Sequence, residues 1–112
     1  MKPQSAKAKG RNLQKWVRDL LLENFPSLEP DDVRSTSMGC GGEDLQLSPA
    51  ARKLFGFSVE CKNTERLNVW DAYEQASANS GNHEPLLVMK KNRKKPLVVL
   101  DAETFVKLIK KL

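Results

Sequence analysis

Two acidic residues and a lysine, Asp44, Glu60 and Lys62, are the side chains of this sequence whose types and spacing best suit chemistry. Two carboxylates can hold Mg²⁺ (or Mn²⁺), a hard cation that prefers oxygen ligands and keeps several waters. Such a cation polarises a phosphoryl oxygen and makes hydroxide available from a bound water near neutral pH. A lysine close by can orient that water or offset the charge developing on phosphorus. The three residues therefore predict metal-dependent cleavage of a phosphodiester bond.

Alternation along two expected strands brings these side chains to one polar surface. Glu60 and Lys62 lie two residues apart in the segment 57–62, so they share one face of that strand. In a second expected strand, Asp44 alternates with Leu45 and so takes the polar face. If the two strands pair, Asp44 converges with the other two. The alternative is a solvated strand face with an ordinary Glu–Lys pair, because a Glu-x-Lys triplet alone is weak.

The elements that must position these residues indicate an α/β domain, with a central mixed β-sheet flanked by α-helices. Strands are expected at 33–38, 44–48, 57–62, 86–89 and 97–100. Helices are expected from about Leu13 until Pro26 ends the first, from Ser48-Pro49 to Phe55, from Asn68 to Asn79, and after Asp101. The last helix carries an apolar face formed by Phe105, Leu108, Ile109 and Leu112.

The composition favours a single domain with an anionic partner. A chain of 112 residues predicts one domain over 11–112, preceded by a flexible basic arm over 1–10 that lacks the apolar stretch of a signal peptide. The net charge of +5 suits nucleic acid or an acidic membrane surface, although an ordinary lysine excess gives the same balance. The apolar runs are too short for a membrane-spanning helix.

Cysteine and histidine usage argues against zinc and against a disulfide framework. Cys40 and Cys61 show no CxxC or Cys/His spacing, and His83 is the single histidine. A cytoplasmic location fits this usage best.

The segments Gly42-Glu-Asp44-Leu-Gln-Leu and Ser58-Val-Glu60-Cys-Lys62-Asn resemble the PD-(D/E)XK nuclease superfamily. The most similar subset is the small, Holliday-junction-resolvase-like endonucleases of archaea and phages, and the resemblance covers residues 10–112. It implies a restriction-endonuclease-like core and Mg²⁺-dependent hydrolysis of DNA that leaves a 5′-phosphate and a 3′-hydroxyl. It also implies branched DNA as substrate, a homodimer, and the host cytoplasm if the chain is phage-encoded.

The resemblance carries the family's site onto individual residues. Asp44 and Glu60 would be metal ligands, Lys62 the catalytic lysine, and the main-chain carbonyl of Cys61 a further ligand. The side chain of Cys61 would then serve only core packing. The residue before the aspartate is Glu43, where the family has proline.

Two glutamines complete the expected site. Gln14 stands where the family's first-helix glutamate is expected, and its amide can hold a metal-bound water but adds no charge. Gln75 resembles the glutamine that lies beside the site on the helix after the Glu-x-Lys strand. The alternative for Gln75 is a solvent-facing residue of an amphipathic helix.

Nucleic-acid contacts are expected from hydroxyl groups and basic side chains around the site, because both contact phosphate oxygens. These residues are Arg11, Arg34, Ser35, Thr36, Ser37, Lys90, Lys91, Arg93, Lys94 and Lys95. The alternatives are turn chemistry for the hydroxyls and a solvated hairpin loop for the lysine run. Trp16, Trp70 and Tyr73 fall at helical core spacing, which favours packing over base stacking.

Two other functions remain open from the sequence. One is a nuclease for nicks, flaps or single strands in phage DNA processing. The other is a non-catalytic DNA-binding module of the same fold, against which the intact Asp44, Glu60 and Lys62 argue.

Overall fold

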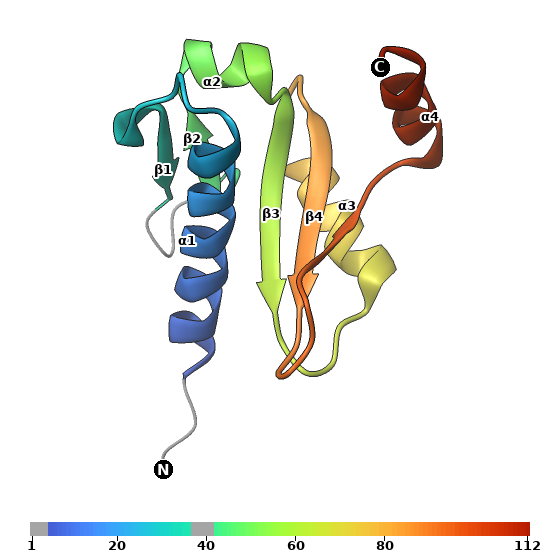
Figure 1. The fold of residues 1–112 in the computed structure, drawn as a ribbon. Helices are drawn as coiled ribbons and strands as arrows, with labels where there is room; N and C mark the ends of the chain where they lie inside the picture. Colours follow the sequence, from blue (N-terminus) through green and yellow to red (C-terminus); the bar gives the residue numbers. More distant parts are fainter. Residues whose placement is uncertain (1–4, 37–41) are drawn as a thin grey trace.

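The computed structural model describes residues 5–36 and 42–112. Their elements follow the order α1 (Ala6–Asn24), the 3₁₀ turn η1 (Pro30–Asp32), β1 (Val33–Ser35), β2 (Leu45–Leu47), α2 (Pro49–Leu54), β3 (Phe57–Asn63), α3 (Val69–Ala78), β4 (Glu84–Lys90), β5 (Leu97–Val99) and α4 (Ala102–Lys110) (Figure 1). The predicted caps are confirmed: Ser48, Asn68 and Asp101 each accept a backbone N–H at the start of a helix.

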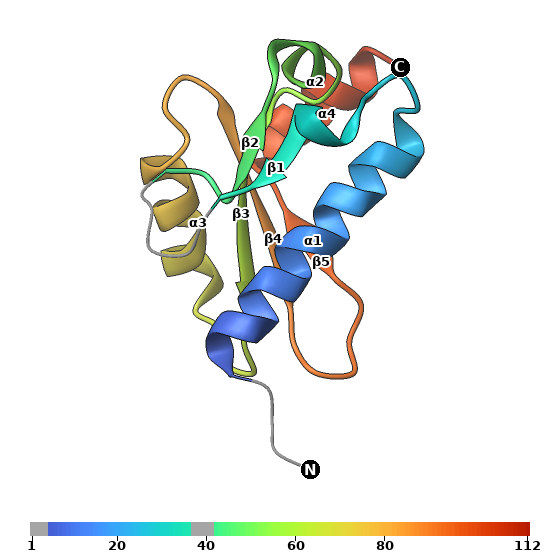
Figure 2. The same ribbon diagram turned by 90° about the vertical axis from the view of Figure 1, so that its left-hand side faces the viewer.

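The sheet is mixed, as predicted. Strand β3 pairs with β4 in parallel and β4 pairs with β5 antiparallel, whereas β1 and β2 form a separate antiparallel pair. Figure 2 shows the three-stranded sheet lying between α1 on one side and α3 on the other. The α/β class and the helices that flank a central mixed sheet are confirmed.

The main core fills the space between α1 and one face of the sheet. Leu13 and Val17 of α1 cluster there with Val59, Cys61 and Val88, and all five are buried. Because side chains alternate along a strand, Glu60 and Lys62 of β3 lie on the opposite face, which α3 covers. The sheet therefore separates an apolar side from the side that carries the predicted catalytic residues.

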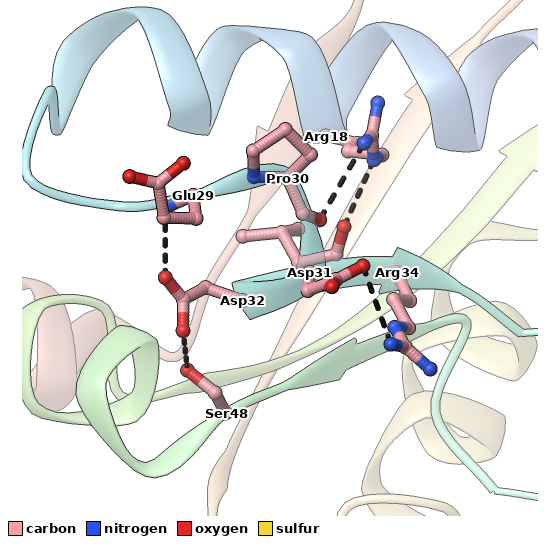
Figure 3. Close-up of polar contacts among 8 residues, drawn as sticks. Arg18, Glu29, Pro30, Asp31, Asp32, Arg34 and Ser48 are labelled. Carbon is pink, nitrogen blue, oxygen red and sulfur yellow. Dashed lines mark hydrogen bonds and ion pairs between the residues drawn. The ribbon is translucent and has the colours of Figure 1, made fainter.

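A network of polar contacts joins α1, η1, β1 and α2 (Figure 3). Arg18 of α1 donates to the carbonyl of Val33 at 2.9 Å, which fixes the helix across the start of β1. The carboxylate of Asp32 accepts from the N–H of Glu29 at 2.7 Å and from the hydroxyl of Ser48 at 2.6 Å. These hydrogen bonds, that of Ser48 first, hold the pKa of Asp32 below its ordinary value.

Three expectations about the elements are wrong. Helix α1 begins at Ala6, capped by Ser5, so residues 6–10 are helical and not part of a flexible arm; alanine and lysine favour helix there. The strand expected at 33–38 ends at Ser35 in its described part. Strand β2 forms a ladder with β1 and not with β3, so the pairing expected to bring Asp44 to β3 is replaced by hydrogen bonds of Asp44 itself.

Several large apolar side chains expected in the core are exposed. The exposed fraction is 45% for Trp16 and 81% for Trp70, so the core-packing prediction is wrong for both. Helix α4 buries no residue, and its apolar side chains are exposed. The helix lies on the far side of β4 from α1 (Figure 1). The apolar spacing predicted the helices correctly, but it did not show which of their apolar residues pack against other elements. Within the described ranges, no helix has the length and apolar character needed to cross a membrane.

We expect Ser48→Ala to destabilise the protein, because Ser48 both caps α2 and donates to Asp32. Loss of such a cap costs about 1 kcal/mol, which lowers the melting temperature by a few degrees in a domain of this size. Thermal unfolding followed by circular dichroism measures the change. Ser27→Ala, at an exposed position, is the control. An equal melting temperature for both variants would contradict the role given to Ser48.

Candidate active site

Asp44 is fixed by hydrogen bonds on both sides of its backbone. Its N–H donates to the carbonyl of Val59 in β3, and its carbonyl accepts from the N–H of Thr36, each at 2.8 Å. Its carboxylate accepts from the N–H of Cys61 at 2.6 Å. These bonds place the Asp44 carboxylate against the free edge of β3, the edge opposite β4.

Glu60 and Lys62 share a face of β3 and touch, as alternation predicted. Lys62 Nζ lies 3.8 Å from Glu60 Oε1, and Glu60 is only 5% exposed. Asn79, which ends α3, donates to Glu60 Oε2 at 3.5 Å. Glu60 is thus held between a strand neighbour and the end of the helix that covers its face.

The charge of Asp44 acts on the neighbouring carboxylate of Glu60, which is buried. Burial raises the pKa of Asp44, while the Cys61 N–H and the charge of Lys62 lower it in part. Burial also raises the pKa of Glu60, and the charge of Asp44 raises it further. Both carboxylates therefore ionise at a cost that the nearby donors do not fully offset. A cation bound between them would lower that cost.

Cys61 contributes its backbone and not its thiol. Its side chain is 8% exposed within the core, which confirms the packing role expected for it. Burial raises the pKa of this thiol, and the charges of Asp44 and Glu60 raise it further, so the sulfur stays protonated. In a strand the N–H and C=O of one residue point to the same side. The Cys61 carbonyl is thus directed to the edge where Asp44 lies.

This donor set suits Mg²⁺ or Mn²⁺ better than a softer metal. It offers two carboxylates and one backbone carbonyl, and Mg²⁺ is commonly held by one or two carboxylates with waters at its remaining positions. Among residues 5–36 and 42–112, no group of three or more His, Cys, Asp or Glu side chains is arranged around a metal position. The arrangement is therefore a lean one, in which substrate oxygens and waters would complete the coordination.

The other residues expected beside the carboxylates have different surroundings. Gln14 is 5% exposed on α1, which lies on the face of the sheet opposite Glu60, and its Oε1 has no hydrogen-bond partner among residues 5–36 and 42–112. Gln75 is exposed on α3, one turn before Asn79. No hydrogen bond in the described structure joins either glutamine to Asp44 or Glu60.

Thr36 has a structural role in place of the phosphate contact expected for it. It is 8% exposed, and its hydroxyl donates to the carbonyl of Glu43 at 2.7 Å, so that proton is not available to a phosphate. Ser35 is exposed, and Arg34 is exposed and pairs with Asp31 at 3.3 Å. Ser37 lies outside the described residues.

The predicted basic hairpin is confirmed between β4 and β5. It begins where β3 ends, because Asn63 is in register with Lys90. Three residues along a strand span about 10 Å, so the hairpin starts about that far from Glu60. The start of α1 is at the same end of the sheet, since the Asn63 amide donates to the carbonyl of Lys9 at 3.0 Å. Arg11, two residues further along α1, is exposed.

Sequence reasoning missed two contributors to the site. Asn79 was interpreted only as the end of a helix, although an amide there can also reach a neighbouring strand. Arg52 of α2 pairs with Glu43 at 2.6 Å and donates to the carbonyl of Phe57 at 3.0 Å. It thereby ties the residue before Asp44 to the start of β3. A basic residue on the helix between the two site strands was the available signal for this contact.

Comparisons of the chain with protein-family models, with curated proteins and with solved structures found no match.

We expect Glu60→Gln to stabilise the metal-free protein, increasingly so as the pH rises. Because the folded pKa of Glu60 is raised, the free energy of unfolding is highest below the ordinary carboxyl pKa and falls as the pH rises through the folded value. Glutamine does not ionise and escapes that loss. Melting temperatures in EDTA should therefore be higher for Glu60→Gln than for the wild type, with a difference that grows as the pH rises.

Glu74→Gln, an exposed position on α3, is the control for this pH series. It removes one carboxylate without relieving the burial of another, so its melting temperature should follow the wild type at every pH. A difference between Glu60→Gln and wild type that does not change with pH would show that burial of the Glu60 charge is not the cause.

Proposed function

We propose that this protein is a metal-dependent endonuclease that hydrolyses DNA phosphodiester bonds. The observation that carries the proposal is the pair of neighbouring carboxylates, half-buried Asp44 and buried Glu60, with Lys62 at 3.8 Å from the second. Two desolvated acids that repel each other reduce stability unless a cation joins them, and such arrangements cluster at functional sites. The resemblance to the PD-(D/E)XK superfamily supports the same function, with a restriction-endonuclease-like core.

In this proposal Asp44, Glu60 and the Cys61 carbonyl hold Mg²⁺ or Mn²⁺. When bound, the cation supplies Lewis-acid stabilisation of the phosphodiester and a water of lowered pKa. The hydrogen bond from the Cys61 N–H fixes one oxygen of Asp44 and leaves its other oxygen for the metal. Lys62 offsets the negative charge that develops on the phosphorus oxygens. Gln75, on α3 one turn before Asn79, has a supporting role.

Branched DNA is the substrate that we propose, by analogy with the resolvase-like subset of the family, and the cytoplasm is the compartment. The positive net charge and the basic hairpin support a nucleic-acid partner, because lysines release counterions from the phosphate backbone. By the same analogy, the products carry a 5′-phosphate and a 3′-hydroxyl.

We expect Glu60→Ala and Lys62→Ala to lower the cleavage rate by about 100-fold or more while DNA binding persists, because both act on the reacting phosphate. The assay uses four-way junction, nicked, flapped, matched duplex and single-stranded DNA with Mg²⁺ or Mn²⁺ against EDTA. Glu74→Ala and Lys53→Ala, both exposed, are charge-matched controls. Cleavage that survives Glu60→Ala or EDTA would refute the catalytic assignment, and equal cutting of all substrates would refute the preference for junctions.

We also propose a symmetric dimer, which would present two sites for paired incisions. Its support is the open apolar face of α4, where Phe105 is 54% and Ile109 51% exposed. A helix of 9 residues is only marginally stable in water unless one of its faces packs against another part of the protein or a partner. Its charges suit a second copy, because antiparallel pairing of two α4 helices sets the acidic first turn, with Glu103, against the basic last turn of the partner, with Lys107 and Lys110.

We expect Ile109→Glu to weaken self-association by about tenfold or more, because it places a charge in the centre of the apolar face. Sedimentation equilibrium measures this against a monomer mass of 12.6 kDa. Leu54→Glu on α2, where the side chain is 49% exposed, is the control of matched exposure. The dimer would be excluded if wild type sediments as a monomer, and its α4 interface if both variants dimerise like wild type.

A further inference from the structure

A cavity of about 430 Å³ opens beside the end of β3, between the segment that leads into α3 and the β4–β5 hairpin. Its apolar lining comes from Leu67, Val69, Met89 and Leu97. The volume lies within the range of pockets that hold small ligands. An apolar hollow that stays open in this part of the fold can receive a flat, apolar group.

The cavity lies on the same face of the sheet as Glu60. Lys62 is in register with Met89 of β4, and Met89 with Leu97 of β5, so these three side chains form a row across one face. Glu60 begins the neighbouring row, two residues back along β3. Two residues along a strand span about 7 Å. The cavity is therefore adjacent to the proposed catalytic residues and not at a remote surface.

Four lysines line the rim of the cavity: Lys90, Lys91, Lys94 and Lys95. Glu65 also lines the cavity, and its carboxylate accepts from the N–H of Asn92 at 2.7 Å. The net charge of the lining is thus strongly positive. An apolar hollow with a basic rim selects a ligand that combines an apolar body with negative charge, which is the chemistry of a nucleotide.

Trp70 follows the lining residue Val69 in the first turn of α3 and is 81% exposed. Neither the core nor the carboxylate site uses this side chain. Proteins that bind single strands combine a positively charged groove with aromatic side chains on which bases stack. Trp70 supplies the aromatic group that the cavity itself lacks.

We propose that this cavity binds one unpaired nucleotide of the DNA substrate, with its base against Met89 and Leu97 and its phosphates at the lysine rim. Trp70 stacks on an adjacent base. The inference rests on the proposed function, which supplies DNA as the partner. It adds a physical reason why the protein would prefer branched, flapped or single-stranded DNA over matched duplex. A fully paired base cannot enter the cavity unless it leaves the stack, and this unstacking disfavours matched duplex.

The test is binding of a labelled oligo-dT of about 12 nucleotides, followed by fluorescence anisotropy in EDTA. Leu97→Asp places a charge in the cavity, and Val98→Asp places the same charge on the other face of the same strand, where the side chain is 61% exposed. We expect Leu97→Asp to lower single-strand affinity about tenfold and Val98→Asp less than about twofold. We expect the affinity for a matched DNA duplex to change little in either variant, and by the same factor in both.

The tryptophans give a second, direct readout. The chain has 2 tryptophans, so Trp16→Phe leaves Trp70 as the only one. We expect oligo-dT to quench its emission, and Leu97→Asp to weaken that quenching. Trp70→Ala should reduce single-strand affinity by about fivefold or more, whereas Trp16→Ala, on α1 beyond the opposite face of the sheet, should not.

Equal effects of Leu97→Asp and Val98→Asp, or unchanged Trp70 emission at saturating oligo-dT, would overturn the proposal. Competition by thymidine 5′-monophosphate would identify a free nucleotide as a second source of the same ligand, and its failure would restrict the cavity to nucleotides within a strand. Because EDTA prevents metal-dependent cleavage, these results are independent of catalysis. A protein that binds oligo-dT in this way but cuts no DNA would refute the nuclease and leave the cavity assignment intact.

Discussion

The hydrogen bonds between Asp44 and β3 are the constraint on which the site depends. Strand β2 forms no ladder with β3, so the backbone bond from Asp44 to Val59 and the bond from the Cys61 N–H to the Asp44 carboxylate make the connection. Thr36 and Arg52 hold the preceding residue, Glu43, at its carbonyl and at its carboxylate. A carboxylate held at both backbone and side chain cannot turn away from its like-charged neighbour.

The charge repulsion between Asp44 and Glu60 is therefore built into the fold. In a loose loop two acids would separate and stay hydrated, whereas here burial raises the pKa of both. Lys62 and Asn79 lie at 3.8 Å and 3.5 Å from the Glu60 carboxylate, too far for strong compensation. If a cation binds between the two carboxylates, as proposed, it would stabilise the folded state, and metal affinity would then be linked to folding stability.

The parts of the site that the sequence predicted are those set by local rules. Alternation places Glu60 and Lys62 on one face whatever the rest of the chain does, and the caps of α2, α3 and α4 follow from single residue types. What it could not predict depends on contacts between distant elements. Asn79 reaches β3 only because α3 crosses that face, and the same helical period that predicts a buried Trp70 leaves it 81% exposed. Helical periodicity shows which residues share one face of a helix, but not whether another element packs against that face.

The two faces of the sheet explain how so small a chain can hold both a core and a site. The apolar residues of α1 pack on one face of the sheet, and α3 buries only the two alanines Ala72 and Ala76 on the other. These short side chains keep α3 close at the Glu60 row, where Asn79 makes its contact. In the next row, Met89 and Leu97 lie where β4 and β5 meet the hairpin, and their side chains line the cavity. The proposed catalytic residues and the proposed nucleotide cavity thus lie next to each other on one face of the sheet, and a substrate strand running past Lys62 would meet both in succession.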